Sequence, residues 1–141
     1  MNWNDRRLQF REIMEKQICE NPASVFDPIS GRIAEELKYK VGILAGSIAS
    51  MTILGDPDLL LITLSEFSAQ ALRISRSNKL PLLVDADHGY GNALNVRRTV
   101  EELETSGVAA LTIEDTELPI SYGANNNLGL LGIEEGIGKM K

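Results

Sequence analysis

The stretch LPLLVDADHGYGN, residues 80–92, joins an apolar run to two aspartates and a loop that contains glycine. The apolar part, residues 80–84, has no alternating polar positions, which is typical of a strand buried on both faces of a sheet. Strands of that kind occur in parallel sheets covered by helices. The stretch therefore predicts an α/β fold with acidic side chains at the carboxyl end of a strand.

The same pattern of an apolar run with a polar end, followed by a helical segment, occurs four times along the chain. The apolar runs that we expect to be strands are residues 23–26, 41–45, 80–84 and 108–113. Asp27-Pro28 is a typical helix start, and Thr63 with Glu66 forms a capping box that opens another helix. The repeated order of strand and helix predicts four consecutive βα units.

We expect one domain over residues 1–141. Residues 1–20 would form an N-terminal helix outside the repeat, with its helical part over residues 5–20, and residues 21–141 would hold the four βα units. The composition agrees with a globular domain, because 43% of the residues are hydrophobic and 24% are charged.

Charge and composition exclude several classes of protein. The net charge of -6 disfavours a nucleic-acid partner, and no apolar run is long enough to predict a membrane span. The single cysteine, Cys19, and the single histidine, His88, exclude a disulfide framework and a zinc site with several histidines. We expect a cytoplasmic protein with no membrane or nucleic-acid partner.

Polar side chains stand at the carboxyl end of every expected strand: Asp27, Ser47, Asp85, Asp87, Glu114 and Asp115. In a (β/α)₈ barrel these ends converge on the face where barrel enzymes keep their chemistry. A doubly wound nucleotide-binding fold would instead carry a glycine fingerprint after the first strand, where this chain has Asp27-Pro28. The fold class that we predict is therefore α/β of the (β/α)₈ TIM-barrel type.

The acidic residues differ in what their surroundings predict. Asp27 is best interpreted as a helix cap, Asp115 as a solvated loop residue, and His88 as a hydrogen-bonding loop residue. Asp85 and Asp87 lie two apart on a strand and would project to the same side, where like charges repel unless a cation or proton lies between them. With Glu114 they would form an oxygen-only set, which suits Mg²⁺ or Mn²⁺.

The motifs SVFDPIS, ITLSEF, DADHGYGNALNV and TIEDTELP, which lie between residues 24 and 119, resemble the isocitrate lyase/phosphoenolpyruvate mutase superfamily, and within it the oxaloacetate decarboxylase branch. The resemblance covers essentially the whole chain. It implies a (β/α)₈ barrel, a Mg²⁺ cofactor with Mn²⁺ as a possible substitute, a small 2-oxo acid as substrate, and assembly into a homo-oligomer. The activity it implies is decarboxylation of oxaloacetate to pyruvate and CO₂.

The resemblance also implies roles for individual residues. Asp85 would bind the metal directly, while Asp58, Asp87 and Glu114 would hold its water shell. Asp58 and Asp85 would be the catalytic residues. Gly46 and Ser47, with neighbouring backbone N–H groups, would bind the carboxylate of the substrate.

Two alternatives remain beside the decarboxylase. A methylisocitrate-type lyase or a phosphonopyruvate-related enzyme is disfavoured, because residues 120–127 contain neither the cysteine nor the lysine that the superfamily's gating loops carry. A full barrel needs about 250 residues, so a chain of 141 residues predicts a half-barrel. The second alternative is a catalytically inactive half-barrel that serves as a binding or structural module.

Overall fold

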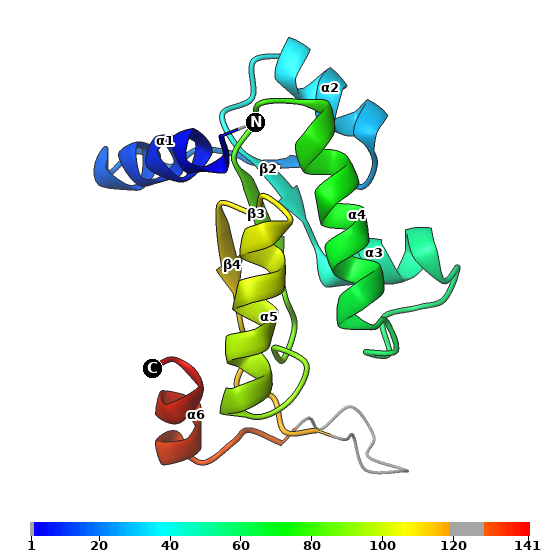
Figure 1. Ribbon diagram of the computed structural model, residues 1–141, viewed down its shortest axis with the longest axis vertical. Coiled ribbons are helices and arrows are strands. Elements are labelled where there is room, and N and C mark those ends of the chain that lie inside the picture. Colours follow the sequence, from blue (N-terminus) through cyan, green and yellow to red (C-terminus); the bar gives the residue numbers. More distant parts are fainter. Residues whose placement is uncertain (1, 119–128) are drawn as a thin grey trace.

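The computed structural model describes residues 2–118 and 129–141, which form a four-stranded parallel sheet with helices (Figure 1). The strands are β1 (Ala23–Ser24), β2 (Gly42–Leu44), β3 (Leu82–Asp85) and β4 (Ala110–Thr112), and they lie in the order of the sequence. Ile43 pairs with Ser24 on one side and with Leu83 on the other, and Leu83 pairs with Ala110. The predicted α/β class and the four parallel strands are confirmed.

Each strand is separated from the next by helical segments. The helices are α1 (Trp3–Glu15), α2 (Pro28–Glu36), α3 (Gly46–Ile53), α4 (Leu64–Ser77), α5 (Ala93–Thr105) and α6 (Ile133–Lys139). Helix α4 lies between α2 and α5 and contacts both (Figure 1). Among the described residues, no helix is long and apolar enough to cross a membrane.

The core lies between the sheet and the layer formed by α2, α4 and α5. Leu44 and Val84 point into it from the strands and are fully buried, as are Phe67 and Leu103 from the helices. The strand residues that alternate with them, such as Ile43 and Leu83, are only partly buried. The sheet therefore has one helix-covered face and one open face, as expected for consecutive βα units of a barrel wall.

Both predicted helix starts are confirmed. Asp27 is the N-cap of α2 and forms a capping box with Ser30, and Thr63 caps α4 in a capping box with Glu66. The face of α2 that carries Ile29 and Ile33 remains exposed, however, and Gly31 and Ala34 are the buried residues of that helix.

All four strands differ in their bounds from the expected residues 23–26, 41–45, 80–84 and 108–113, and the N-terminal helix is shorter than expected. The first strand ends at Ser24, because the N–H groups of Phe26 and Asp27 donate to the Ser30 hydroxyl, each at 3.0 Å, and turn the chain out of the sheet. Helix α1 ends at Glu15, and Gln17 follows with a left-handed φ of 52°. Residues 46–53, which the sequence pattern did not resolve, form α3.

Candidate functional site

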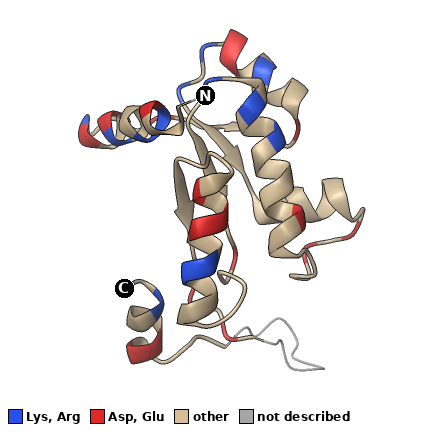
Figure 2. Cartoon of the chain, viewed as in Figure 1, with Lys and Arg blue, Asp and Glu red and all other residues tan. Residues whose placement is uncertain are grey.

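The predicted site residues lie at the carboxyl end of the sheet. Asp85 is the last residue of β3, Asp87 and Glu114 follow the ends of β3 and β4, and Asp58 lies in the loop between α3 and α4. Figure 2 shows the acidic segments of these loops at the lower end of the sheet, away from the basic segments of α2 and α4. The clustering of acids at one end of the sheet follows from the parallel strand order.

Asp87 has an unusual local geometry. Its side chain is buried, and its φ of 47° lies in the left-handed region, which is uncommon for residues other than glycine. Its N–H donates to Oδ1 of Asp85 at 3.3 Å, and its carbonyl accepts the N–H of Glu114 at 2.7 Å. The expectation that Asp85 and Asp87 project from one strand is therefore wrong, because β3 ends at Asp85 and the chain turns before Asp87.

The electrostatics of Asp87 connect the four predicted acids. Burial of this carboxyl, followed in order of importance by the negative charges of Asp85, Asp58 and Glu114, raises its pKa to about 7. Among the ion pairs of the described residues, none involves any of these four acids. Asp87 is thus an acid that is costly to ionise unless a cation is present.

The four acids do not form a closed ligand cage. Within residues 2–118 and 129–141, no group of three or more His, Cys, Asp or Glu side chains could hold a metal ion between them. Asp85 is half-buried, and Asp58 and Glu114 are exposed to solvent. A cation bound here would need water molecules to complete its coordination, as Mg²⁺ commonly keeps in proteins.

Gly46 lies against Asp87 at the start of α3, and Ser47 follows it. Gly46 is buried, and a methyl group added to it would overlap the Asp87 carboxylate, so glycine is needed for the close approach of α3 to Asp87. Ser47 is exposed, and α3 has no side-chain cap. Its first turn thus presents backbone N–H groups and a hydroxyl near the acids, an arrangement that favours an anion.

Three residues that the sequence did not single out orient the acids. Thr112 Oγ1 donates to Oδ1 of Asp85 at 3.2 Å, and Thr116 Oγ1 donates to Oε2 of Glu114 at 2.7 Å. Lys139 Nζ donates to the carbonyl of Glu114 at 3.1 Å. The position of both threonines near the ends of strands was a usable signal, whereas a lysine near the end of a short helix gives none.

His88 and Tyr90 lie in the loop after Asp87, with their ring centroids 5.6 Å apart. Burial and the Lys139 charge lower the pKa of the His88 imidazole. The backbone carbonyl of His88 accepts a hydrogen bond from Lys139, whereas the buried Nδ1 of its side chain has no partner among the described residues. Burial, followed by the charges of Asp87 and Asp85, raises the pKa of the Tyr90 hydroxyl.

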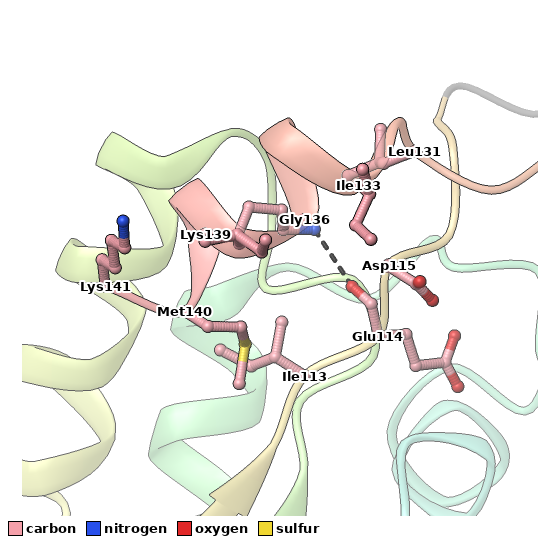
Figure 3. Close-up of a pocket in the computed structure, with 10 residues that line it drawn as sticks. Ile113, Glu114, Asp115, Leu131, Ile133, Gly136, Lys139, Met140 and Lys141 are labelled. Carbon is pink, nitrogen blue, oxygen red and sulfur yellow. Dashed lines mark hydrogen bonds between the residues drawn. The ribbon is translucent and has the colours of Figure 1, made fainter.

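A cavity of about 460 Å³ lies between the end of β4 and α6 (Figure 3). Of the predicted site residues, only Glu114 lines it, and its other walls include Ile113, Ile133 and Met140. The cavity therefore adjoins the acidic cluster without containing it. Residues 120–127, in which the sequence lacks the lyase cysteine and lysine, lie outside the described residues.

Comparisons with known proteins find relatives over nearly the whole chain. Residues 10–141 match the protein-family model described as phosphoenolpyruvate phosphomutase. The chain is 60% identical over 141 residues to the oxaloacetate decarboxylase of Rhodopseudomonas palustris (strain BisB18). The match covers 100% of this chain and 49% of that protein.

Two solved structures share the fold. The phosphoenolpyruvate phosphomutase of Streptomyces platensis subsp. rosaceus superposes with a TM-score of 0.84 at 27% identity, over 95% of this chain and 47% of that chain. An oxaloacetate acetylhydrolase in complex with the inhibitor 3,3-difluorooxalacetate superposes with a TM-score of 0.81 at 29% identity, over 95% of this chain and 46% of that chain. The chain spans about half the length of the relatives it matches, and its four βα units form a half-barrel, as predicted.

Proposed function

The chain belongs to the phosphoenolpyruvate phosphomutase family, and from this premise we propose that it takes part in metal-dependent decarboxylation of oxaloacetate to pyruvate and CO₂. The observation that carries the proposal is the buried Asp87 carboxyl, whose pKa is raised to about 7 among three further acids. The relative that is 60% identical is named oxaloacetate decarboxylase. The relative with 3,3-difluorooxalacetate supports a 2-oxo acid as the class of substrate.

The donor chemistry fits Mg²⁺, or Mn²⁺ in its place. All four acids offer oxygen ligands, and Asp85 would bind the ion directly, as the resemblance to the superfamily implies. Asp58, Asp87 and Glu114 would hold its water molecules. A bound ion would supply a Lewis acid that stabilises the negative charge developing on oxaloacetate as its C3–C4 bond breaks.

The chain's own residues would bind and orient the substrate. The Ser47 hydroxyl and the first N–H groups of α3 would hold a carboxylate at the positive end of that helix. Gly46 permits this by bringing α3 against Asp87. Asp58 and Asp85 would act as the catalytic carboxylates of this proposal, as the resemblance to the superfamily implies.

Binding of Mn²⁺ and release of pyruvate from oxaloacetate test this function, the latter after subtraction of the spontaneous rate. Asp85→Asn should abolish both, while Asp115→Asn, which removes the same charge from the residue after Glu114, should leave both unchanged. Binding of Mn²⁺ without release of pyruvate would favour a binding module instead. Equal Mn²⁺ affinity in the wild type and Asp85→Asn would reject the metal site.

We also propose that the chain associates with a second copy of itself. Strands β1 and β4 are the outer strands of the sheet, and unpaired backbone groups on such strands favour pairing with another chain. Exposed apolar surface also favours association, and α2 and the residue after it contribute Ile29, Ile33 and Leu37 to this surface. Light scattering at micromolar concentration should give a dimer or larger species, and a cooperatively melting monomer would reject this expectation.

A further inference from the structure

Lys139 has a side chain that is only 6% exposed, which is rare for lysine. It lies at the end of α6, and its Nζ donates to the carbonyls of His88 at 2.7 Å and Glu114 at 3.1 Å. Figure 3 shows the side chain extending back along α6 toward the Glu114 carbonyl, while Lys141 points away from it. The two acceptors belong to the loops after β3 and β4.

These two loops carry the buried acid and one of the exposed acids of the candidate site. His88 directly follows Asp87, and the Glu114 N–H donates to the Asp87 carbonyl at 2.7 Å. The ammonium group of Lys139 therefore joins the same two loops that this backbone bond joins. We call these three hydrogen bonds, made by Lys139 Nζ and by the Glu114 N–H, the loop clasp.

We propose that Lys139 is a positioning residue that sets the separation of the Asp87 and Glu114 carboxylates through the loop clasp. This inference rests on the proposed function, since it assigns Lys139 to the same metal site. It adds a residue from α6, which is distant in sequence, to the acids at the ends of β3 and β4.

The energetics of burial support a role beyond holding α6 in place. Removing an ammonium group from water is costly, and Lys139 forms no ion pair among the described residues that would offset this cost. Its hydrogen bonds go to two carbonyls instead. An apolar side chain would anchor α6 without this cost, whereas a cation can hold both carbonyls beside a cluster of acids.

Three variants test the assignment. Lys139→Met keeps the length and apolar bulk of the side chain but removes its charge and its hydrogen-bond donors, whereas Lys139→Arg keeps the charge and the donors. Lys141→Met is the matched control at an exposed lysine. Mn²⁺ affinity is measured by electron paramagnetic resonance of the free ion, alongside thermal unfolding. We expect Lys139→Met to weaken Mn²⁺ binding about 10-fold, as is typical when a partner of a ligand is lost. Lys139→Arg should recover most of the affinity, and Lys141→Met should match the wild type.

Amide hydrogen exchange in the metal-free protein provides a second readout that does not depend on the proposed function. The Glu114 amide should exchange faster in Lys139→Met, with amides of the α4 core unchanged. Wild-type Mn²⁺ affinity in Lys139→Met would overturn the proposal. If the wild type binds no Mn²⁺, the proposed function fails. In that case the exchange rate of the Glu114 amide still tests the loop clasp, and an unchanged rate in Lys139→Met would overturn it. If Lys139→Met does not fold, Lys139→Gln replaces it with the same expectations.

Discussion

Asp27 and Asp87 each lie after a strand of the same parallel sheet, yet their surroundings shift their pKa values in opposite directions. Asp27 accepts the Ser30 N–H at 2.7 Å, and this backbone hydrogen bond, followed by the Ser30 side chain, lowers its pKa. Asp87 is buried beside three other acids, and burial raises its pKa to about 7. An acid near a strand end is thus structural where N–H donors surround it. Where other acids surround it, it is a candidate for a functional residue.

The contrast also explains why the two acids need different partners. Asp27 has its compensating donors within the first turn of α2, so no ligand is required to stabilise its charge. Asp87 donates its own N–H to Asp85 and faces acids, so its ionised form requires a proton or a cation from outside the chain. Asp27 is therefore the internal control for Asp87.

The largest expected effect is on stability in the presence of a chelator. Asp87 keeps its proton to about pH 7 when folded, whereas an ordinary aspartate loses it near 3.8, so the folded state loses stability as pH rises between these values. The side chain of Asp87→Asn does not titrate. At pH 8 the free energy of unfolding of this variant should therefore exceed that of the wild type by up to about 4 kcal/mol, since each pKa unit is worth about 1.36 kcal/mol. The measurement is urea unfolding between pH 4 and 8.

Asp27→Asn should show the opposite sign in the same experiment. Its lowered folded pKa contributes stability that is present above the unfolded pKa and is lost as pH falls through the folded value. The variant should therefore be less stable than the wild type at neutral pH, with a difference that shrinks in acid. Parallel pH profiles for the two variants would show that the environments of Asp27 and Asp87 do not differ as described.

The next effect in size concerns the metal. Asp85→Ala should reduce Mn²⁺ affinity by at least about 100-fold, or about 2.7 kcal/mol, because it removes the direct ligand of the proposed site. Asp87→Ala should cost about 10-fold, because its contact would pass through water. Asp27→Ala should have no effect, and titration calorimetry at one pH compares all three. An Asp27→Ala loss as large as that of Asp85→Ala would contradict the separation between structural and functional acids.

The sequence predicted the strand order and the helix starts well, because these depend on local patterns. Continuous apolar runs indicated parallel strands, and Asp27 and Thr63 were recognisable as caps from the residues that follow them. The end of β1 was not predictable in the same way, since it depends on the Ser30 hydroxyl accepting two N–H groups from the preceding chain. That competition between a side chain and the sheet becomes visible only in three dimensions.

The charges of Asp85, Asp58 and Glu114 act on Asp87, but the strand geometry expected for Asp85 and Asp87 was wrong. Period-two alternation holds within a strand, and it failed for Asp87 because β3 ends at Asp85 and the chain then enters the left-handed region. The role of Lys139 was not predicted, because its environment depends on the docking of α6 on the loops after β3 and β4. Burial of a charged side chain by tertiary contacts leaves no mark in the sequence around it.

The smallest expected effect is the loss of the Asp27 cap. Asp27→Ala removes the acceptor for the Ser30 N–H and should lower the free energy of unfolding by about 1 kcal/mol, the usual value for a helix N-cap. Asp27→Ser keeps an acceptor oxygen without the charge and should recover most of this loss at pH 7. Urea unfolding compares the variants, and Mn²⁺ affinity should be the same in all of them. A larger loss accompanied by weaker Mn²⁺ binding would place Asp27 in the site and remove the contrast with Asp87, because a cap that acts only on α2 cannot change a cation bound beyond β3.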